Sequence, residues 1–244
     1  MVVEFSRKTI YILYLLVIFI DLFFIAILFY DVQNQPNQLT VIPQFLLGKV
    51  DLKNESNLST WYSSIILFIA ACLAFLNLQV NAYSNKLKWV YLSGWSLIGC
   101  LLLILSADES AIIHESIASI AYLEKSPVMR NEITLGAGDW IPFLMPFIIA
   151  SVVVLLSFII FSFYKCKKFM LVGLMGVFCW IGSIVGEAIE GKFINIAMSR
   201  ALEGLIEESL EIIGTTLLLI AFAEHYQWRQ KNNVGKAETA LPES

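Results

Sequence analysis

Long apolar segments alternate with polar segments along the whole chain, and this pattern predicts membrane-spanning helices. A helix needs about 20 predominantly apolar residues to cross a bilayer. Stretches of about that length cover residues 9–30, 61–78, 89–107, 140–163, 169–186 and 205–222. The pattern therefore predicts an all-α, polytopic membrane bundle of six transmembrane helices, which forms a single domain over residues 1–228. The polar residues 229–244 are predicted to form a flexible cytoplasmic tail.

The polar segments between these predicted helices differ in length. Residues 31–60, 108–139 and 187–204 form three long segments, and the alternation of the helices places all three on one side of the membrane. Apolar residues recur at helical spacing after Asp108, so we expect the third helix to continue past the bilayer as an amphipathic helix. Pro127 is the expected stop of that extension.

Composition and charge support the membrane class. Hydrophobic residues make up 58% of the 244 residues and charged residues 15%, which is too apolar for one soluble core of this size. Ten of the 16 Lys and Arg residues lie on the side that holds both termini, and this bias is typical of cytoplasmic ends. We therefore expect a protein of the bacterial inner membrane, with the lipid bilayer as a partner and no nucleic acid.

Acidic residues gather at the opposite, outward ends of the predicted helices. In the sixth helix the uninterrupted apolar run covers only residues 212–222, which at 1.5 Å per residue spans about 16 Å of a hydrocarbon core of about 30 Å. The helix crosses the membrane only if Glu207, Glu208 and Glu211 enter its outer half. Charges at that depth are costly and are typical of functional sites.

The same outward side receives acidic residues from two other predicted helices. Asp108, Glu109, His114 and Glu115 follow the third helix, and Glu187 ends the fifth. We expect these groups to converge with the acids of the sixth helix. The expected ligands of a metal or cation are, in order, Glu115, Glu208 and Glu211, then Asp108, His114 and Glu207, with Glu109, Glu187 and Glu55 supporting them.

Several kinds of chemistry use many carboxylates and one imidazole. Dinuclear iron or manganese sites in helical bundles use this donor set, whereas structural zinc requires more nitrogen or sulfur than His114 supplies. A membrane metalloenzyme acting on a lipid or quinone-like substrate is one hypothesis, and its catalytic residues are left open. A proton- or cation-coupled transporter is the alternative, with Asp21 as a proton relay. A structural or partner-binding protein without a site is the third.

The remaining motifs are less specific. The apolar segment near the N-terminus is too long for a signal peptide and is expected to stay uncleaved. Gly182 and Gly186 form a GxxxG pair, which favours close helix packing within the chain or in a homo-oligomer. Asn54 and Asn57 begin NxS patterns, which matter only in a glycosylating pathway. The four cysteines show no CxxC spacing and are expected to be packing residues.

Three stretches together carry a resemblance to a known group. They are NLSTWYSS at residues 57–64, SADESAIIHE at 106–115 and LIEESLEIIG at 205–214. The chain resembles uncharacterised bacterial multi-pass membrane proteins in which TWxSS, DExxxxHE and EExxExxG stretches recur in that order. The resemblance implies that the group's polar positions match Glu55, Asp108, Glu109, His114, Glu115, Glu187, Glu207, Glu208 and Glu211. Ser59 stands where many relatives carry Pro.

Overall fold

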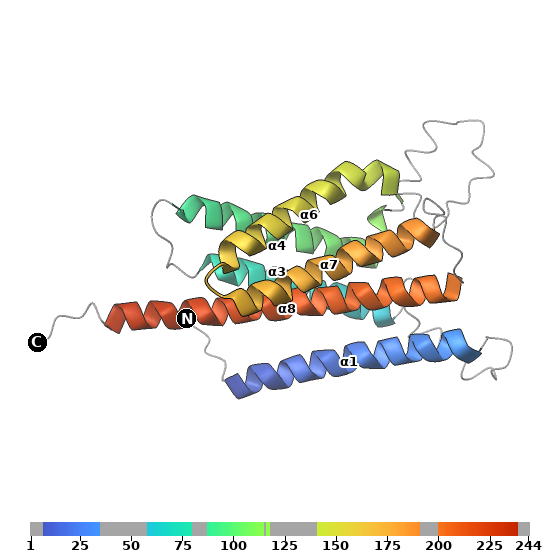
Figure 1. The fold of residues 1–244 in the computed structure, drawn as a ribbon, viewed down its shortest axis with the longest axis horizontal. Helices are drawn as coiled ribbons and strands as arrows, with labels where there is room; N and C mark the ends of the chain where they lie inside the picture. Colours follow the sequence, from blue (N-terminus) through green and yellow to red (C-terminus); the bar gives the residue numbers. More distant parts are fainter. Residues whose placement is uncertain are drawn as a thin grey trace, which may run out of the picture.

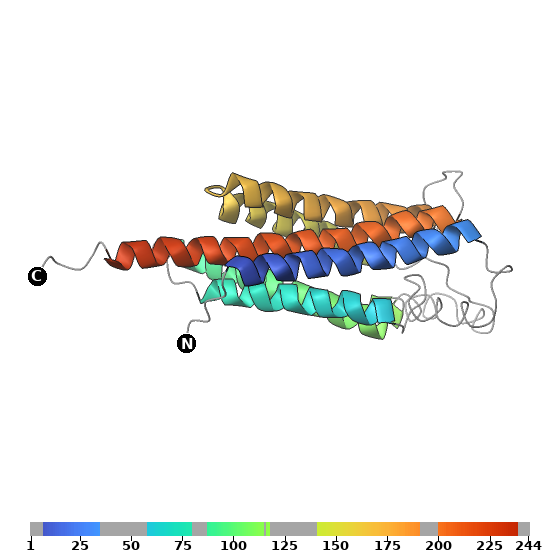
Figure 2. The ribbon, with the colours of Figure 1, turned by 90° about the horizontal axis from the view of Figure 1, so that it is seen from below.

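Long helices lying side by side make up the part of the chain that the computed structural model describes, residues 7–34, 58–79, 87–114, 116–117, 141–190 and 200–238 (Figure 1). The helices are α1 (Arg7–Asn34), α3 (Leu58–Leu78), α4 (Lys88–Ala111), α6 (Ile141–Phe163), α7 (Lys167–Glu190) and α8 (Arg200–Glu238). We call the end where α4 and α7 end and α8 begins the acidic end. The other is the basic end, and α8 projects beyond its neighbours there (Figure 2).

Five of these helices, namely α1, α3, α4, α6 and α7, are long and apolar enough to cross a membrane. The all-α class is therefore confirmed for the described residues, and the chain has the helices of an integral membrane protein. Helix α8 does not meet that criterion, because its apolar run is short and lies between the acids of its first turns and the polar residues that follow Phe222. A sixth span and the orientation of the termini stay predictions.

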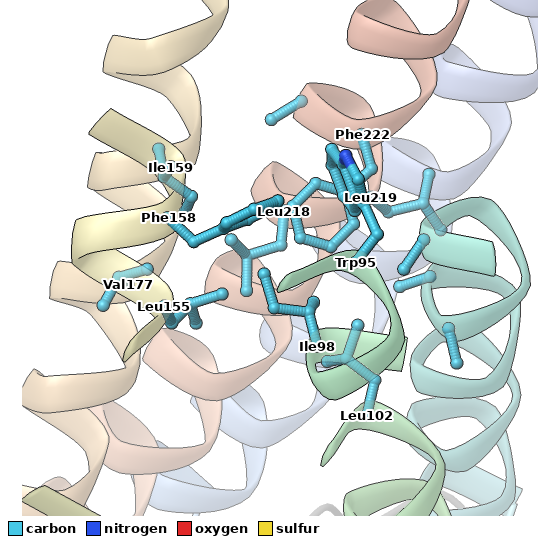
Figure 3. Packing of buried hydrophobic residues seen from close by; sticks show 14 of the residues in the cluster. Trp95, Ile98, Leu102, Leu155, Phe158, Ile159, Val177, Leu218, Leu219 and Phe222 are labelled. Atoms are coloured by element: carbon cyan, nitrogen blue, oxygen red, sulfur yellow. The ribbon is translucent and has the colours of Figure 1, made fainter. Parts of the chain in front are cut away.

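Helix α8 lies at the centre of the bundle, where it contacts α1, α3 and α7. The largest cluster of buried residues joins α8 to α3, α4, α6 and α7, and aromatic rings from α4, α6 and α8 pack together in it (Figure 3). The Trp95 ring lies 5.2 Å from both Phe158 and Phe222, in each case edge to face. In a membrane, close packing of this kind and interhelical hydrogen bonds replace the hydrophobic effect as the force that holds helices together.

Helices α7 and α8 approach most closely at two glycines that face each other. A Cβ atom at Gly176 would lie 2.9 Å from the backbone oxygen of Gly214. Further along α7, Gly182 faces Leu210, and Gly186 faces Glu207. The GxxxG pair therefore packs against α8 of the same chain. A role of these glycines in a homo-oligomer stays a prediction.

Helices α3 and α4 are joined by a reciprocal pair of serines. The Ser64 hydroxyl donates to the backbone oxygen of Ser106 at 2.7 Å, and the Ser106 hydroxyl donates to the backbone oxygen of Ser64 at 2.8 Å. Small side chains allow this approach, and each hydroxyl meets a backbone acceptor on the other helix. The pair fixes α4 against α3 one turn before α4 reaches the acidic end.

Two predicted boundaries differ from the observed ones. Helix α4 ends at Ala111, because Ile112 adopts a left-handed conformation with φ 53°, and residues 113–114 and 116–117 are helical beyond this break. The rest of the predicted extension, with its stop at Pro127, lies outside the described residues. At the other end of the chain, α8 continues to Glu238, so residues 229–238 are helical where the sequence predicts a flexible tail. Side-chain bonds one turn apart support this helix, such as Gln230 to Tyr226 at 2.7 Å.

Candidate functional site

The end of α4 holds an aspartate and a histidine in direct contact. Oδ1 of Asp108 accepts the backbone N–H of His114 at 2.7 Å, and Oδ2 lies 2.8 Å from Nδ1 of the same histidine. Both side chains are about one quarter exposed or less. A carboxylate bonded to Nδ1 fixes the ring orientation and leaves Nε2 as the nitrogen that can exchange a proton or bind an ion.

The break in α4 produces this contact. Residues six apart on a continuous helix would point in different directions, so Asp108 and His114 would not meet. At Ile112 the chain turns, and the backbone N–H of Ile112 donates to the backbone oxygen of Asp108 at 2.7 Å. The turn brings His114 back over the end of the helix. The sequence predicts a continuous helix from Asp108 to Glu115, and the turn at Ile112 contradicts that continuity, whereas Glu115 itself lies outside the described residues.

A left-handed isoleucine stores conformational strain, because its Cβ crowds the backbone in this region. We expect Ile112→Gly to be less destabilising than Ile113→Gly by about 1–2 kcal/mol, because only position 112 has a positive φ among the described non-glycine residues. Equilibrium unfolding of both variants in mixed detergent micelles measures this difference. Equal destabilisation would show that position 112 carries no strain.

Glu211 of α8 joins this pair from across the bundle. Its carboxyl lies close enough to His114 and Asp108 to interact with them electrostatically, and within hydrogen-bonding range of the Glu109 side chain. A hydrogen bond between two carboxyl groups requires a proton on one of them. The backbone beside Glu211 is held as well, because Thr215 donates its hydroxyl to the Glu211 carbonyl at 3.0 Å and accepts from Trp180 of α7 at 3.1 Å.

The structure thus brings together four of the residues that the sequence singles out, Asp108, Glu109, His114 and Glu211, which we call the acid–imidazole cluster. Glu187, Glu207 and Glu208 are half-buried near the acidic end, and each takes part in a polar interaction. Glu115 and Glu55 lie outside the described residues. The described part of the chain holds no group of three His, Cys, Asp or Glu side chains arranged to hold a metal ion.

The cysteines take no part in this cluster. All four are free, and Cys166 lies in the short connection between α6 and α7, at the basic end. Burial raises the pKa of the Cys166 thiol to about 11, so the thiol stays protonated and unreactive at neutral pH.

A second buried acid lies deeper in the bundle. Asp21 of α1 is 4% exposed, and the Tyr62 hydroxyl of α3 donates to its Oδ1 at 2.5 Å. Thr216 of α8 lies beside the same carboxyl. The candidate proton relay Asp21 is therefore held at a junction of α1, α3 and α8, an arrangement that also fits a structural role.

A third polar group lies near the basic end. His225 of α8 is fully buried, and its Nδ1 lies 2.8 Å from Oδ1 of Asn77 on α3. The Asn77 amide donates to the backbone oxygens of Leu73 at 2.8 Å and Phe222 at 3.2 Å. The imidazole lies against the Phe163 ring, with centroids 4.4 Å apart. The group therefore joins α3 and α8 on the side away from the acid–imidazole cluster.

Sequence reasoning did not find Tyr62, Thr216 or His225 as partners in these polar groups. Their residue types are common in membrane helices, and only their positions opposite Asp21 and Asn77 distinguish them. The sequence does place Thr216 and His225 on the same helix as Glu211, which could have indicated that this helix carries polar groups at several depths. The central position of α8, in contact with α1, α3 and α7, was not predicted.

Comparison with known proteins gives one family. No curated protein and no solved structure matches the chain. Residues 10–225, nearly the whole of the helical bundle, match a family model described as a domain of unknown function, DUF8692. The chain therefore belongs to the DUF8692 family.

Proposed function

We propose that the protein is a proton-coupled membrane protein whose acid–imidazole cluster is an outward-facing cation site. The observation that carries this proposal is the placement of polar groups at three depths along α8. Glu211 lies in the acid–imidazole cluster, Thr216 lies beside Asp21, and His225 contacts Asn77. A carrier requires groups at several depths, and the central helix supplies them.

The spacing along α8 divides these groups into two sets. At 1.5 Å per residue, Thr216 lies about 7 Å beyond Glu211, whereas His225 lies about 14 Å beyond Thr216. The first gap is short enough for one or two water molecules to bridge. The second is filled by the buried side chains of Leu218, Leu219 and Phe222. This arrangement fits a site that is accessible from the acidic end and closed toward the basic end.

Each member of the acid–imidazole cluster has a distinct role in this proposal. Glu211 and Glu109 share a proton in their hydrogen bond. His114 exchanges that proton through Nε2, while Asp108 holds the ring by Nδ1 and stabilises the imidazolium form. A second proton acceptor, Asp21, lies deeper on the same side of the apolar barrier formed by Leu218, Leu219 and Phe222.

Proton flux into liposomes tests the proposal. Purified protein is reconstituted into vesicles that contain a pH-sensitive dye, and an imposed pH gradient is followed with potassium and valinomycin present to cancel the membrane potential. We expect the pH gradient to decay faster than in protein-free vesicles. Decay at the protein-free rate under all conditions would overturn the proposal.

Asp21→Asn probes the deeper part of the same path. Asparagine keeps the size of the side chain and accepts from Tyr62, but it cannot take a proton. We expect slower proton flux with an unchanged elution profile of the detergent-solubilised protein. The matched control is Glu224→Gln, which neutralises an acid near the basic end, and we expect it to leave the flux unchanged. Wild-type flux in Asp21→Asn would restrict Asp21 to a structural role.

A divalent metal ion is the second candidate, and the Asp108–His114 contact supports it. Carboxylates bonded to the distal nitrogen of a metal-binding histidine are common in metalloproteins. His114 and Glu211 would be ligands in this case, and Glu115 or Glu208 would have to complete the set, with iron or manganese favoured over zinc. Such a site would suit a membrane metalloenzyme.

Metal analysis separates the two candidates. Protein purified gently after metal-replete growth is compared with a Glu115→Ala, Glu208→Ala, Glu211→Ala variant by mass spectrometry. Near-stoichiometric metal that is lost in the variant would support the metal site. Metal-free wild-type protein would leave the proton as the cation.

A further inference from the structure

A single tyrosine hydroxyl of α3 lies between two oxygen atoms of α1, deep in the bundle. The Tyr62 oxygen is 2.5 Å from Oδ1 of Asp21 and 3.2 Å from the backbone oxygen of Val17. Val17 and Asp21 are four residues apart, so they lie one turn from each other on the same face of α1. The Tyr62 ring packs on Phe24, with centroids 5.1 Å apart, and this contact holds the hydroxyl in place.

The number of protons in this group depends on the form of Asp21. A tyrosine hydroxyl carries one proton, an ionised carboxylate carries none, and a backbone oxygen only accepts. With Asp21 ionised, the one proton can point fully at only one of the two α1 oxygens, and the other oxygen faces a lone pair of Tyr62. With Asp21 protonated, two protons serve the two contacts: Asp21 donates to Tyr62, and Tyr62 donates to the Val17 oxygen.

The surroundings of Asp21 also favour the neutral form. The Asp21 side chain is 4% exposed, and a buried apolar cluster that includes Phe24 and Ile212 packs against the same Tyr62 ring. Within the described ranges of the chain, no Lys, Arg or His forms an ion pair with Asp21. Thr216 of α8 offers a neutral hydroxyl. An unpaired charge in such an environment is costly, so a buried carboxyl group stays neutral instead.

We propose that Asp21 holds a proton at neutral pH and that this proton links α1 to α3. The Asp21 carboxyl donates to Tyr62, and Tyr62 returns the second hydrogen bond to Val17. The link supports a helix with few neighbours, because α1 lies at the edge of the bundle and packs mainly against α8 (Figures 1 and 2). Tyr62 is a positioning residue for the bound proton. The inference does not depend on proton flux, since the proton is bound whether or not the protein moves protons across a membrane.

Infrared spectroscopy at neutral pH tests the bound proton. Protonated carboxyl groups absorb through their C=O stretch, and subtracting the spectrum of Asp21→Asn from that of the wild-type protein cancels every carboxyl group except Asp21. We expect one carboxyl band in this difference. Tyr62→Phe keeps the ring on Phe24 but removes the hydroxyl, so the band should move to higher frequency as the carboxyl loses its partner. Tyr11→Phe, which removes an exposed hydroxyl from α1, is the matched control and should leave the band unchanged.

Two results would overturn the proposal. A difference spectrum with carboxylate bands and no carboxyl band would show that Asp21 is ionised. A carboxyl band at the same frequency in the wild-type protein and in Tyr62→Phe would show that Tyr62 does not bond the proton. If Asp21→Asn does not elute as folded protein in size-exclusion chromatography, the wild-type and Tyr62→Phe spectra still decide whether the band moves. A lack of proton flux in vesicles would contradict the proposed function and leave the bound proton intact.

Discussion

Replacing Glu211 by Gln is expected to reduce proton flux in reconstituted vesicles by about 100-fold or more, the usual contribution of a positioned acid–base group. Glutamine keeps the length of the side chain and still accepts a hydrogen bond, but it cannot take or release a proton. Glu211 is the one member of the acid–imidazole cluster that α8 supplies. Replacing this carboxyl therefore interrupts proton transfer between the groups at the end of α4 and those along α8.

Glu224→Gln is the matched control, because it makes the same change on the same helix close to the basic end. Glu224 interacts with Tyr14 and takes no part in the acid–imidazole cluster. We expect near wild-type flux from this variant. Wild-type flux in Glu211→Gln, or an equal loss in both variants, would contradict the role of Glu211.

Gly176→Ala is expected to destabilise the bundle by about 2–3 kcal/mol, in the upper part of the range for overpacked sites. The added Cβ would meet the Gly214 backbone oxygen at 2.9 Å and the Leu218 backbone nitrogen at 3.2 Å. Backbone atoms cannot move aside as a side chain can, so α7 and α8 would have to separate. Glu211 lies one turn from Gly214, so proton flux should fall as well.

Gly173→Ala provides the comparison on the same helix. Its added Cβ would meet only side-chain atoms, at 3.3 Å from Ile159 and 3.5 Å from Ala221. We expect a destabilisation of less than about 1 kcal/mol, since these contacts relax with small shifts. Unfolding in mixed micelles measures both variants. Equal stability of the two would show that α7 and α8 do not require the Gly176–Gly214 contact.

The helices and the acidic end could be predicted from the sequence, because both depend on local patterns. Apolar runs of about 20 residues identify spans, and the short run before Phe222 indicates that Glu211 enters the bundle. The structure brings Asp108, Glu109, His114 and Glu211 together. Their role in binding an ion remains a proposal.

Contacts that depend on a single backbone dihedral angle could not be predicted in the same way. The Asp108–His114 contact exists because Ile112 adopts a left-handed conformation, and a β-branched residue is among the least expected there. The contact between Tyr62 and Asp21 depends on the register of α3 against α1. That register is set by packing between residues far apart in the chain.

The most direct test of the account is whether the Glu109–Glu211 pair holds a proton that it can release. Infrared difference spectroscopy between high and low pH reports protonated carboxyl groups through their C=O absorption. We expect a carboxyl band in the wild-type protein that Glu211→Gln and Glu109→Gln both remove, while Glu224→Gln leaves it unchanged. A spectrum in which no carboxyl band depends on Glu109 or Glu211 would contradict the account.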